Sequence, residues 1–169
     1  DNIILSVQNG QLDMGVSGFS ITADRIEQVS FTIPHSTTQG QVVMLQSIMT
    51  AKGITTLSSL ADFKTKGIIV GVQSGNVEQT ELQNAGVDIR TWQDSASPFL
   101  DLVSGNPSVQ AVYAETPITT NWINDFKSQG IQVGAVYSHP YYPVAFVVNK
   151  NSHTLLDKMD GVLAQLIFD

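Results

Sequence analysis

The stretch GQLDMGVSGFSITADRIEQVSF, residues Gly10–Phe31, contains a helix end, a short strand, a polar turn and a new helix start. Gly10 is placed to end a preceding helix, because glycine adopts the left-handed cap conformation without a Cβ clash. Residues 12–16 then alternate apolar and small or polar residues, which predicts a short strand. Thr22 is a good N-cap, so we expect the second helix to begin directly after it.

Arg25 falls at about the third position of this second helix, where a cation opposes the helix macrodipole at a cost of about 0.3–1 kcal/mol. The simplest compensation is an anion held between Arg25, the Ser20 hydroxyl and nearby backbone N–H groups. A lone arginine would more simply pair with an acidic neighbour such as Asp13, Asp24 or Glu27. The surrounding serines, glycine and cap favour the anion instead. The predicted members of this site are Ser17, Gly18, Ser20 and Arg25.

Composition narrows the class of function. The 169 residues are 42% hydrophobic and 14% charged, as in a folded domain rather than a disordered chain. A net charge of −7 without a Lys/Arg cluster argues against a nucleic-acid partner and against anionic membrane surfaces. Cysteine is absent, and the three histidines share no metal-ligand spacing. We therefore expect no metal and no cofactor.

The run Val7–Pro34 carries the pattern G-x-x-D…G-x-S-I-T-x-x-R-x-x-x-V-x-F-T-x-P. This pattern closely resembles bacterial extracytoplasmic solute-binding proteins of family 3, the two-lobed receptors of polar amino-acid ABC importers, including glutamine- and lysine/arginine/ornithine-binding types. The resemblance implies a periplasmic-binding-protein type II fold, in which two α/β lobes are joined by two crossover strands. It also implies that Ser20 and Arg25 bind the α-carboxylate of the ligand.

The resembled family begins with a β-α-β segment that forms the first half of its first lobe and supplies an aromatic residue that stacks on the ligand. Here the chain opens instead with an amphipathic helix over residues 2–9. We therefore expect an incomplete first lobe from residues 1–44 and 138–169, and a complete second lobe from residues 45–137. The sequence is then a fragment, the ordered part of a longer chain, or a reduced relative.

Strand and helix patterns alternate between residues 67 and 137, which predicts a mostly parallel sheet with helices on both faces. Extended apolar runs at residues 41–45 and 142–148 match the two crossovers of the family. A terminal amphipathic helix is predicted over Ser152–Leu166, because its leucines fall on one stripe.

Ligands of open parallel sheets bind beyond the carboxyl ends of the strands, where two turns of the second lobe carry suitable groups. The first turn offers Gln73, Gly75 and Asn76, although a plain strand-to-helix turn is the simpler interpretation. At the second turn, Glu115 ends a hydrophobic strand directly before a Thr-Pro helix start, where a capping acid is the simpler alternative. The resemblance gives Glu115 the role of the family's aspartate, which binds the ligand α-ammonium group.

Arg25 and Ser20 together with Glu115 offer opposite charges for a zwitterion, and two closing lobes would bury both charges with partners. The resemblance implies a receptor without catalytic residues. It would bind a polar amino acid in the periplasm, or as a lipoprotein on the outer face of the cytoplasmic membrane, and deliver it to the membrane permease of an ABC importer. Gln73 and Asn76 would meet the ligand side chain, which favours a neutral polar amino acid such as glutamine.

Two other functions stay open. A dehydratase-like enzyme of the same fold could use Glu115 as general acid, but it would need a second titratable group nearby. A sensory ligand-binding module would be distinguished by the sequence flanking this chain. If the chain is only 169 residues long, its unpaired sheet edges and the apolar last helix predict a homo-oligomer that completes the first lobe. Alternatively, about sixty further residues precede it.

Overall fold

The computed structural model describes residues 2–168, and the chain forms two compact units. Unit 1 combines Asp1–Thr38 with Tyr141–Asp169, and unit 2 is Gln39–Pro140. The predicted lobes differ from these units in two short segments, because residues 39–44 and 138–140 belong to unit 2 rather than to the incomplete lobe.

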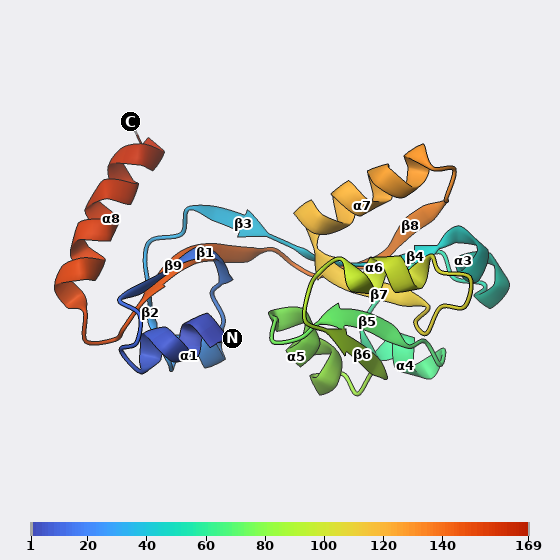
Figure 1. Ribbon diagram of the computed structural model, residues 1–169, viewed down its shortest axis with the longest axis horizontal. Coiled ribbons are helices and arrows are strands. Elements are labelled where there is room, and N and C mark those ends of the chain that lie inside the picture. The colour runs from blue at the N-terminus through green and yellow to red at the C-terminus, as the bar shows by residue number, and fades with distance from the viewer. Residues whose placement is uncertain (1, 169) are drawn as a thin grey trace. The chain divides into compact units, whose positions relative to one another are not determined.

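Unit 1 is built on a four-stranded antiparallel sheet (Figure 1). Its elements are α1 (Asn2–Gln8), β1 (Met14–Ser20), α2 (Ala23–Ile26), β2 (Ser30–Phe31), β3 (Ser36–Thr38), β9 (Tyr142–Val148) and α8 (His153–Phe168). Strand β9 is central, with β1 along one edge and the short β2 and β3 along the other. The run predicted as a crossover at residues 142–148 is therefore the central strand of a sheet.

The opening stretch of unit 1 follows the sequence prediction closely. Gly10 has a φ of 71° and follows α1 as its end signal, and Thr22 is the N-cap of α2. The strand lies later than residues 12–16, over Met14–Ser20, because the amides of Gln11 and Leu12 donate to the Ser6 carbonyl and hold these residues in a turn.

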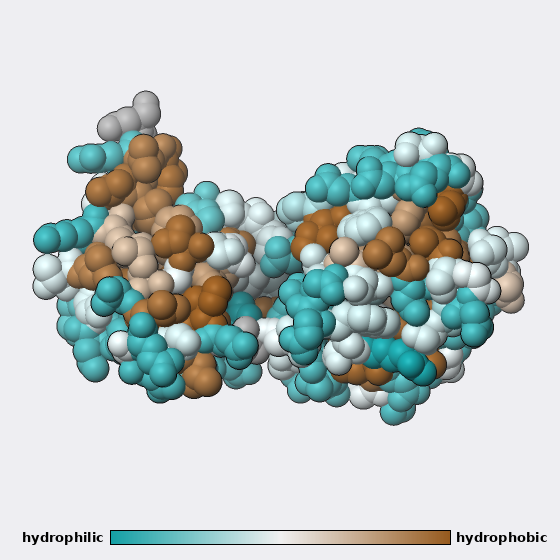
Figure 2. Space-filling model, viewed as in Figure 1, coloured by the Kyte–Doolittle hydropathy of each residue, from teal (hydrophilic) through white to brown (hydrophobic). Residues whose placement is uncertain are grey.

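The core of unit 1 is small. Its cluster of fully buried apolar side chains consists of Ile4, Val7, Val29 and Val147. Helix α8 confirms the predicted terminal helix, but none of its described side chains is buried. Asp160 Oδ1 accepts a hydrogen bond from the Ile33 amide at 2.8 Å, which ties α8 to the segment after β2. Figure 2 shows apolar surface along α8.

Unit 2 is a five-stranded sheet covered by helices on both faces, with strand order β6-β5-β7-β4-β8. Its elements are β4 (Gly40–Leu45), α3 (Gln46–Lys52), α4 (Ala61–Thr65), β5 (Val70–Gln73), α5 (Val77–Asn84), β6 (Ile89–Trp92), α6 (Ser97–Leu102), β7 (Ala111–Glu115), α7 (Thr116–Ser128) and β8 (Val133–Ser138). Strands β6, β5 and β7 are parallel, as predicted. Strand β4 lies between β7 and β8 and is antiparallel to both.

The predicted crossover at residues 41–45 is thus an internal strand of unit 2, because its side chains fill both cores. Val42 and Met44 face the cluster that contains Phe63 and Leu82, from α4 and α5. Val43 faces the opposite cluster, which contains buried side chains from α6 and α7. Gly40 is required where β4 passes Tyr113, since a Cβ there would lie 2.5 Å from the tyrosine hydroxyl oxygen.

Candidate ligand-binding site

The predicted site residues of unit 1 lie at an irregularity of its sheet. Gly15 and Phe19 of β1 pair with residues that are only two apart on β9, so the segment between them bulges out of the ladder. Ser17 and Gly18 lie in this bulge and are exposed. Bulges of this kind redirect side chains and are common beside binding sites.

Ser20 and Arg25 are brought together at the end of β1. Ser20 is buried, with 3% of its surface exposed, and Arg25 is half-buried in α2. Arg25 Nη1 donates to the Ser20 carbonyl oxygen at 3.2 Å, while its backbone N–H donates to Thr22 Oγ1 at 3.4 Å. The first bond holds the guanidinium beside the end of β1, and the second caps α2.

The turn after β5 leads into α5 at Asn76, as predicted, and is held by hydrogen bonds of its own. Asn76 caps α5 through Oδ1, which accepts from the Gln79 amide at 2.9 Å. The Gly75 amide, at a residue with φ of 80°, donates to Gln79 Oε1 at 2.7 Å. This bond ties the turn to the first part of α5. Gln73 Nε2 donates to the Gln93 carbonyl at 3.2 Å.

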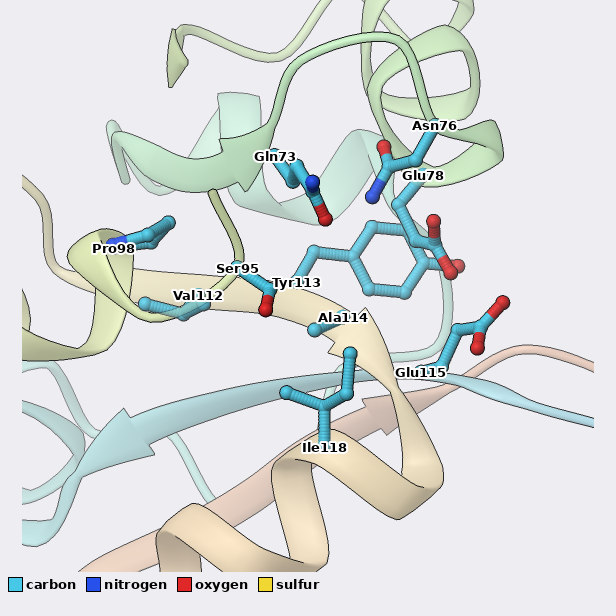
Figure 3. A pocket seen from close by; sticks show the side chains of 10 residues that line it. All are labelled: Gln73, Asn76, Glu78, Ser95, Pro98, Val112, Tyr113, Ala114, Glu115 and Ile118. Atoms are coloured by element: carbon cyan, nitrogen blue, oxygen red, sulfur yellow. The ribbon is translucent and has the colours of Figure 1, made fainter. Parts of the chain in front are cut away.

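A cavity of about 150 Å³ lies within unit 2 at the carboxyl ends of β5 and β7 (Figure 3). Its lining comes from both strands, from the segments that follow them and from the segment after β6: Gln73, Asn76, Glu78, Ser95, Pro98, Val112, Tyr113, Ala114, Glu115 and Ile118. The cavity brings together three of the predicted residues and leaves Gly75 outside its lining. Glu78, Ser95 and Tyr113 were not predicted.

Glu115 occupies the N-cap position of α7, yet its side chain makes no capping hydrogen bond. The simpler alternative, an acid that interacts favourably with the helix dipole, is compatible with this position, but its side chain is not a hydrogen-bonding cap. Thr116 begins the helix, and its hydroxyl donates to the Gln39 carbonyl at 2.6 Å. The half-buried Glu115 carboxylate lines the cavity instead.

Glu78 is a buried charged residue of the cavity lining that the sequence prediction missed. Only 5% of its surface is exposed, although it is a charged residue in the first turn of α5. The sequence held one signal, the apolar residue Leu82 four positions later on the same helix face.

A hydrogen-bonded tyrosine forms one side of the cavity. Tyr113 is fully buried, and its hydroxyl donates to Glu81 Oε2 at 2.6 Å. Burial, followed by the bond to Glu81 and the charges of Glu81 and Glu78, raises the pKa of Tyr113 far above its ordinary value. His139 Nε2 lies 3.2 Å from Glu81 Oε1. Tyr113 therefore stays a neutral donor.

The described residues contain neither a metal-binding cluster nor a membrane-spanning helix. No group of three or more His, Cys, Asp or Glu side chains among them is arranged to hold a metal ion. No helix within residues 2–168 has the length and apolar character needed to cross a membrane.

Two α/β units, one with a polar cavity at its strand ends, have the fold of type II periplasmic binding proteins. The whole chain, residues 1–169, matches the model of the bacterial extracellular solute-binding proteins, family 3, and it belongs to that family.

Named relatives extend this finding. The chain is 25% identical, over its full length, to the ABC transporter arginine-binding protein 1 of Escherichia coli K12, and spans 66% of that protein. An ancestral arginine-binding protein, solved with arginine, is 27% identical with a TM-score of 0.80; 98% of this chain aligns with 70% of it. An ancestral arginine-binding protein bound to glutamine gives a TM-score of 0.77 at 27% identity, and 98% of this chain aligns with 70% of it.

Proposed function

We propose that this chain is part of a receptor that captures an amino acid outside the cytoplasm and delivers it, chemically unchanged, to the permease of an ABC importer. The observation that carries the proposal is a pair of polar sites of opposite charge, one in each unit. An α-amino acid bears the two matching charges on neighbouring groups.

Unit 1 supplies the site for the α-carboxylate. Its guanidinium, Arg25, is held at the end of β1 by the Ser20 carbonyl, so the geometry of the fork is set before a ligand arrives. A pre-oriented guanidinium is well suited to a planar carboxylate, because it can donate two parallel hydrogen bonds. Ser17, Gly18 and the Ser20 hydroxyl are the proposed neighbours of this carboxylate.

Unit 2 supplies the site for the α-ammonium group. Glu115 lines the cavity at the carboxyl end of β7, and its carboxylate is the proposed partner of the ammonium group. Gln73 and Asn76 line the same cavity and provide amide groups for the ligand side chain. The ligands named for similar proteins, arginine and glutamine, are amino acids and fit this assignment.

Thermal unfolding of the full-length protein with each of the common amino acids tests the proposal. A ligand that binds only the folded protein raises the unfolding temperature by mass action, so at least one amino acid should do so. If none of them shifts the transition, the receptor proposal is refuted.

The same incubation separates a receptor from an enzyme. An enzyme of this fold would need a second titratable group beside Glu115, and Glu78 does line the same cavity. The amino acid is recovered after incubation with the protein, and its mass is measured by mass spectrometry. We expect an unchanged mass, whereas a dehydrated or deaminated product would favour the enzyme.

The family is extracellular, and we propose the periplasm or the outer face of the cytoplasmic membrane as the location. The homo-oligomer that would complete the first lobe stays a prediction. Light scattering on material of verified mass tests it, because a well-folded monomer of these 169 residues would contradict it.

A further inference from the structure

A histidine lies at one of the places where the chain passes between the two units. The chain passes between them at Thr38–Gln39 and at Pro140–Tyr141. His139 directly precedes the second place, and its backbone N–H donates to the Gly40 carbonyl, just after the first, at 2.8 Å. The backbone of His139 therefore ties the two connecting segments of unit 2 together.

Both ring nitrogens of His139 face oxygen atoms. Nδ1 lies 2.9 Å from the Pro140 carbonyl oxygen, and Nε2 lies 3.2 Å from Oε1 of Glu81, on α5. A neutral imidazole has one N–H and one lone pair, so either tautomer would point a lone pair at one of these oxygens. The imidazolium donates from both nitrogens. The arrangement is therefore the one that the protonated side chain satisfies.

The carboxylate beside His139 also holds a residue of the cavity wall. Glu81 Oε2 accepts from the Tyr113 hydroxyl at 2.6 Å, and Tyr113 lines the cavity from β7. The side chains of His139 and Glu81 are only 24% and 15% exposed, so salt screens their contact less than it would a contact at the open surface. A continuous series of contacts thus leads from the connecting segment through His139, Glu81 and Tyr113 to the cavity.

The titratable side chains around this series are Tyr113 on β7, Tyr137 on β8 and Glu78 on α5, whose charge acts on Tyr113. Burial raises the pKa of both tyrosines, so both stay neutral donors near neutral pH. Carboxylates are ordinarily ionised there, whereas histidine is the side chain that ordinarily gains or loses its proton between about pH 5 and 8. Protonation of His139 is therefore the event expected to change the charge of this group in that range.

We propose that His139 is a positioning residue whose protonation strengthens the binding of the amino acid. The imidazolium holds Glu81, and Glu81 in turn holds Tyr113 at the cavity wall. When His139 loses its proton, a lone pair faces an oxygen atom and this support is lost, so affinity falls as the pH rises. The inference rests on the proposed function and adds a dependence on pH to it.

Calorimetric titration of the full-length protein at about pH 5.5 and about pH 7.5, on either side of the ordinary titration of histidine, tests the inference. L-arginine and L-glutamine are the probes. Each variant is compared with the unchanged protein at the same pH, so any change in the ionisation of the probe cancels. His139→Gln should bind about two- to five-fold more weakly than the unchanged protein at the acidic pH and equally well at the higher pH.

Glu81→Gln removes the charge beside His139 and keeps an oxygen that can accept from Tyr113. It should cause the same loss at the acidic pH, and the double variant should lose no more than either single variant, because both changes remove one contact. His153→Gln is the matched control, since His153 is exposed on α8 of the other unit. It should leave the dependence on pH unchanged.

Thermal unfolding without an amino acid gives a readout that does not depend on the receptor function. The contact of His139 with Glu81 stabilises the fold while the histidine is protonated, and this contribution is lost as the pH rises. The unfolding temperature of His139→Gln should therefore lie below that of the unchanged protein at the acidic pH and match it at the higher pH.

The outcomes separate this inference from the receptor function. An affinity ratio between His139→Gln and the unchanged protein that is the same at both pH values would overturn the inference and leave the receptor intact. Fully additive losses in the double variant, or equal unfolding temperatures at the acidic pH, would also overturn it. Binding of neither probe would overturn the coupling to affinity, and the screen of all common amino acids then decides the receptor function separately.

Discussion

The two units of this chain differ in how much apolar surface they bury. Unit 2 has two buried clusters, one on each face of its sheet, whereas the cluster of unit 1 contains four fully buried residues. Eleven large apolar side chains are exposed among the described residues, and ten of them belong to unit 1. They are Ile3, Leu5, Leu12, Met14, Val16, Ile26, Tyr141, Val162, Leu166 and Ile167.

This difference shows that correct local structure does not guarantee a core. The helices and strands of unit 1 have their caps, turns and pairings, yet α8 presents its apolar stripe without burying one described side chain. A surface of this kind normally contacts further protein. The relatives named above are longer than this chain, and they contain residues that the present sequence does not match.

The largest expected effect is on independent folding. Residues 39–140 produced alone should unfold cooperatively, because both cores of unit 2 lie inside this range. Residues 1–38 joined by a short linker to residues 141–169 should give a broad, non-cooperative transition. Circular dichroism during heating measures both. A sharp transition for the second protein would show that a cluster of four buried residues is sufficient for cooperative folding.

The next expected effect concerns ligand binding, and it tests whether the poorly packed unit 1 is essential for binding. Arg25→Ala in the full-length protein should weaken amino-acid binding by about 2–5 kcal/mol, because the ligand carboxylate loses its charged partner. Arg25→Lys should recover only part of this loss, since lysine cannot form the bidentate fork. Calorimetry measures the affinities, and an alanine variant with unchanged affinity would refute the role of Arg25.

A matched pair of leucine truncations compares the units directly. Leu82 is fully buried in α5 of unit 2, whereas Leu166 is 78% exposed in α8 of unit 1. Leu82→Ala should lower the free energy of unfolding by about 2–5 kcal/mol through the lost contacts and the cavity. Leu166→Ala should change it by less than about 0.5 kcal/mol. Urea denaturation followed by circular dichroism measures both, and similar losses would contradict the contrast.

Much of unit 2 could be predicted from its sequence, because its signals are local. Asn76 caps α5, Pro117 lies in the first turn of α7, and Gly130 adopts a positive φ after that helix. The position of β4 between β7 and β8 could not be predicted, because strand order depends on pairing between distant residues.

The candidate site was also predictable only where its residues are marked by local sequence signals. Glu115 and Asn76 were predicted because each lies at or just after the carboxyl end of a strand, the edge where ligands bind, and both line the cavity. Glu78 was missed because a charged helix residue normally faces solvent, and its burial depends on contact with distant parts of unit 2. In unit 1, the bulge that exposes Ser17 and Gly18 depends on pairing with β9, which is far away in the chain.

The smallest expected effect concerns the hydroxyl of Tyr113, in the better packed unit. Tyr113→Phe removes the donor to Glu81, whose side chain is only 15% exposed, and leaves that carboxylate with one partner fewer. The free energy of unfolding should fall by about 1–3 kcal/mol near neutral pH. Fluorescence of Trp92 and Trp122 in urea measures this loss, because both tryptophans lie in unit 2.

The same tyrosine makes the stability of unit 2 depend on alkaline pH. Its pKa is raised in the folded protein, so above its ordinary value of 10.0 the unfolded chain releases a proton that the folded chain keeps. The stabilising contribution is therefore complete below pH 10.0 and is lost as the pH rises above it. Between neutral pH and about pH 11, the free energy of unfolding should fall less in the Tyr113→Phe variant than in the unchanged protein. Tyr137, whose pKa is also raised by burial, should preserve part of the dependence. Parallel curves of the free energy of unfolding against pH for the two proteins would contradict this prediction, because they would mean that folding does not raise the pKa of Tyr113.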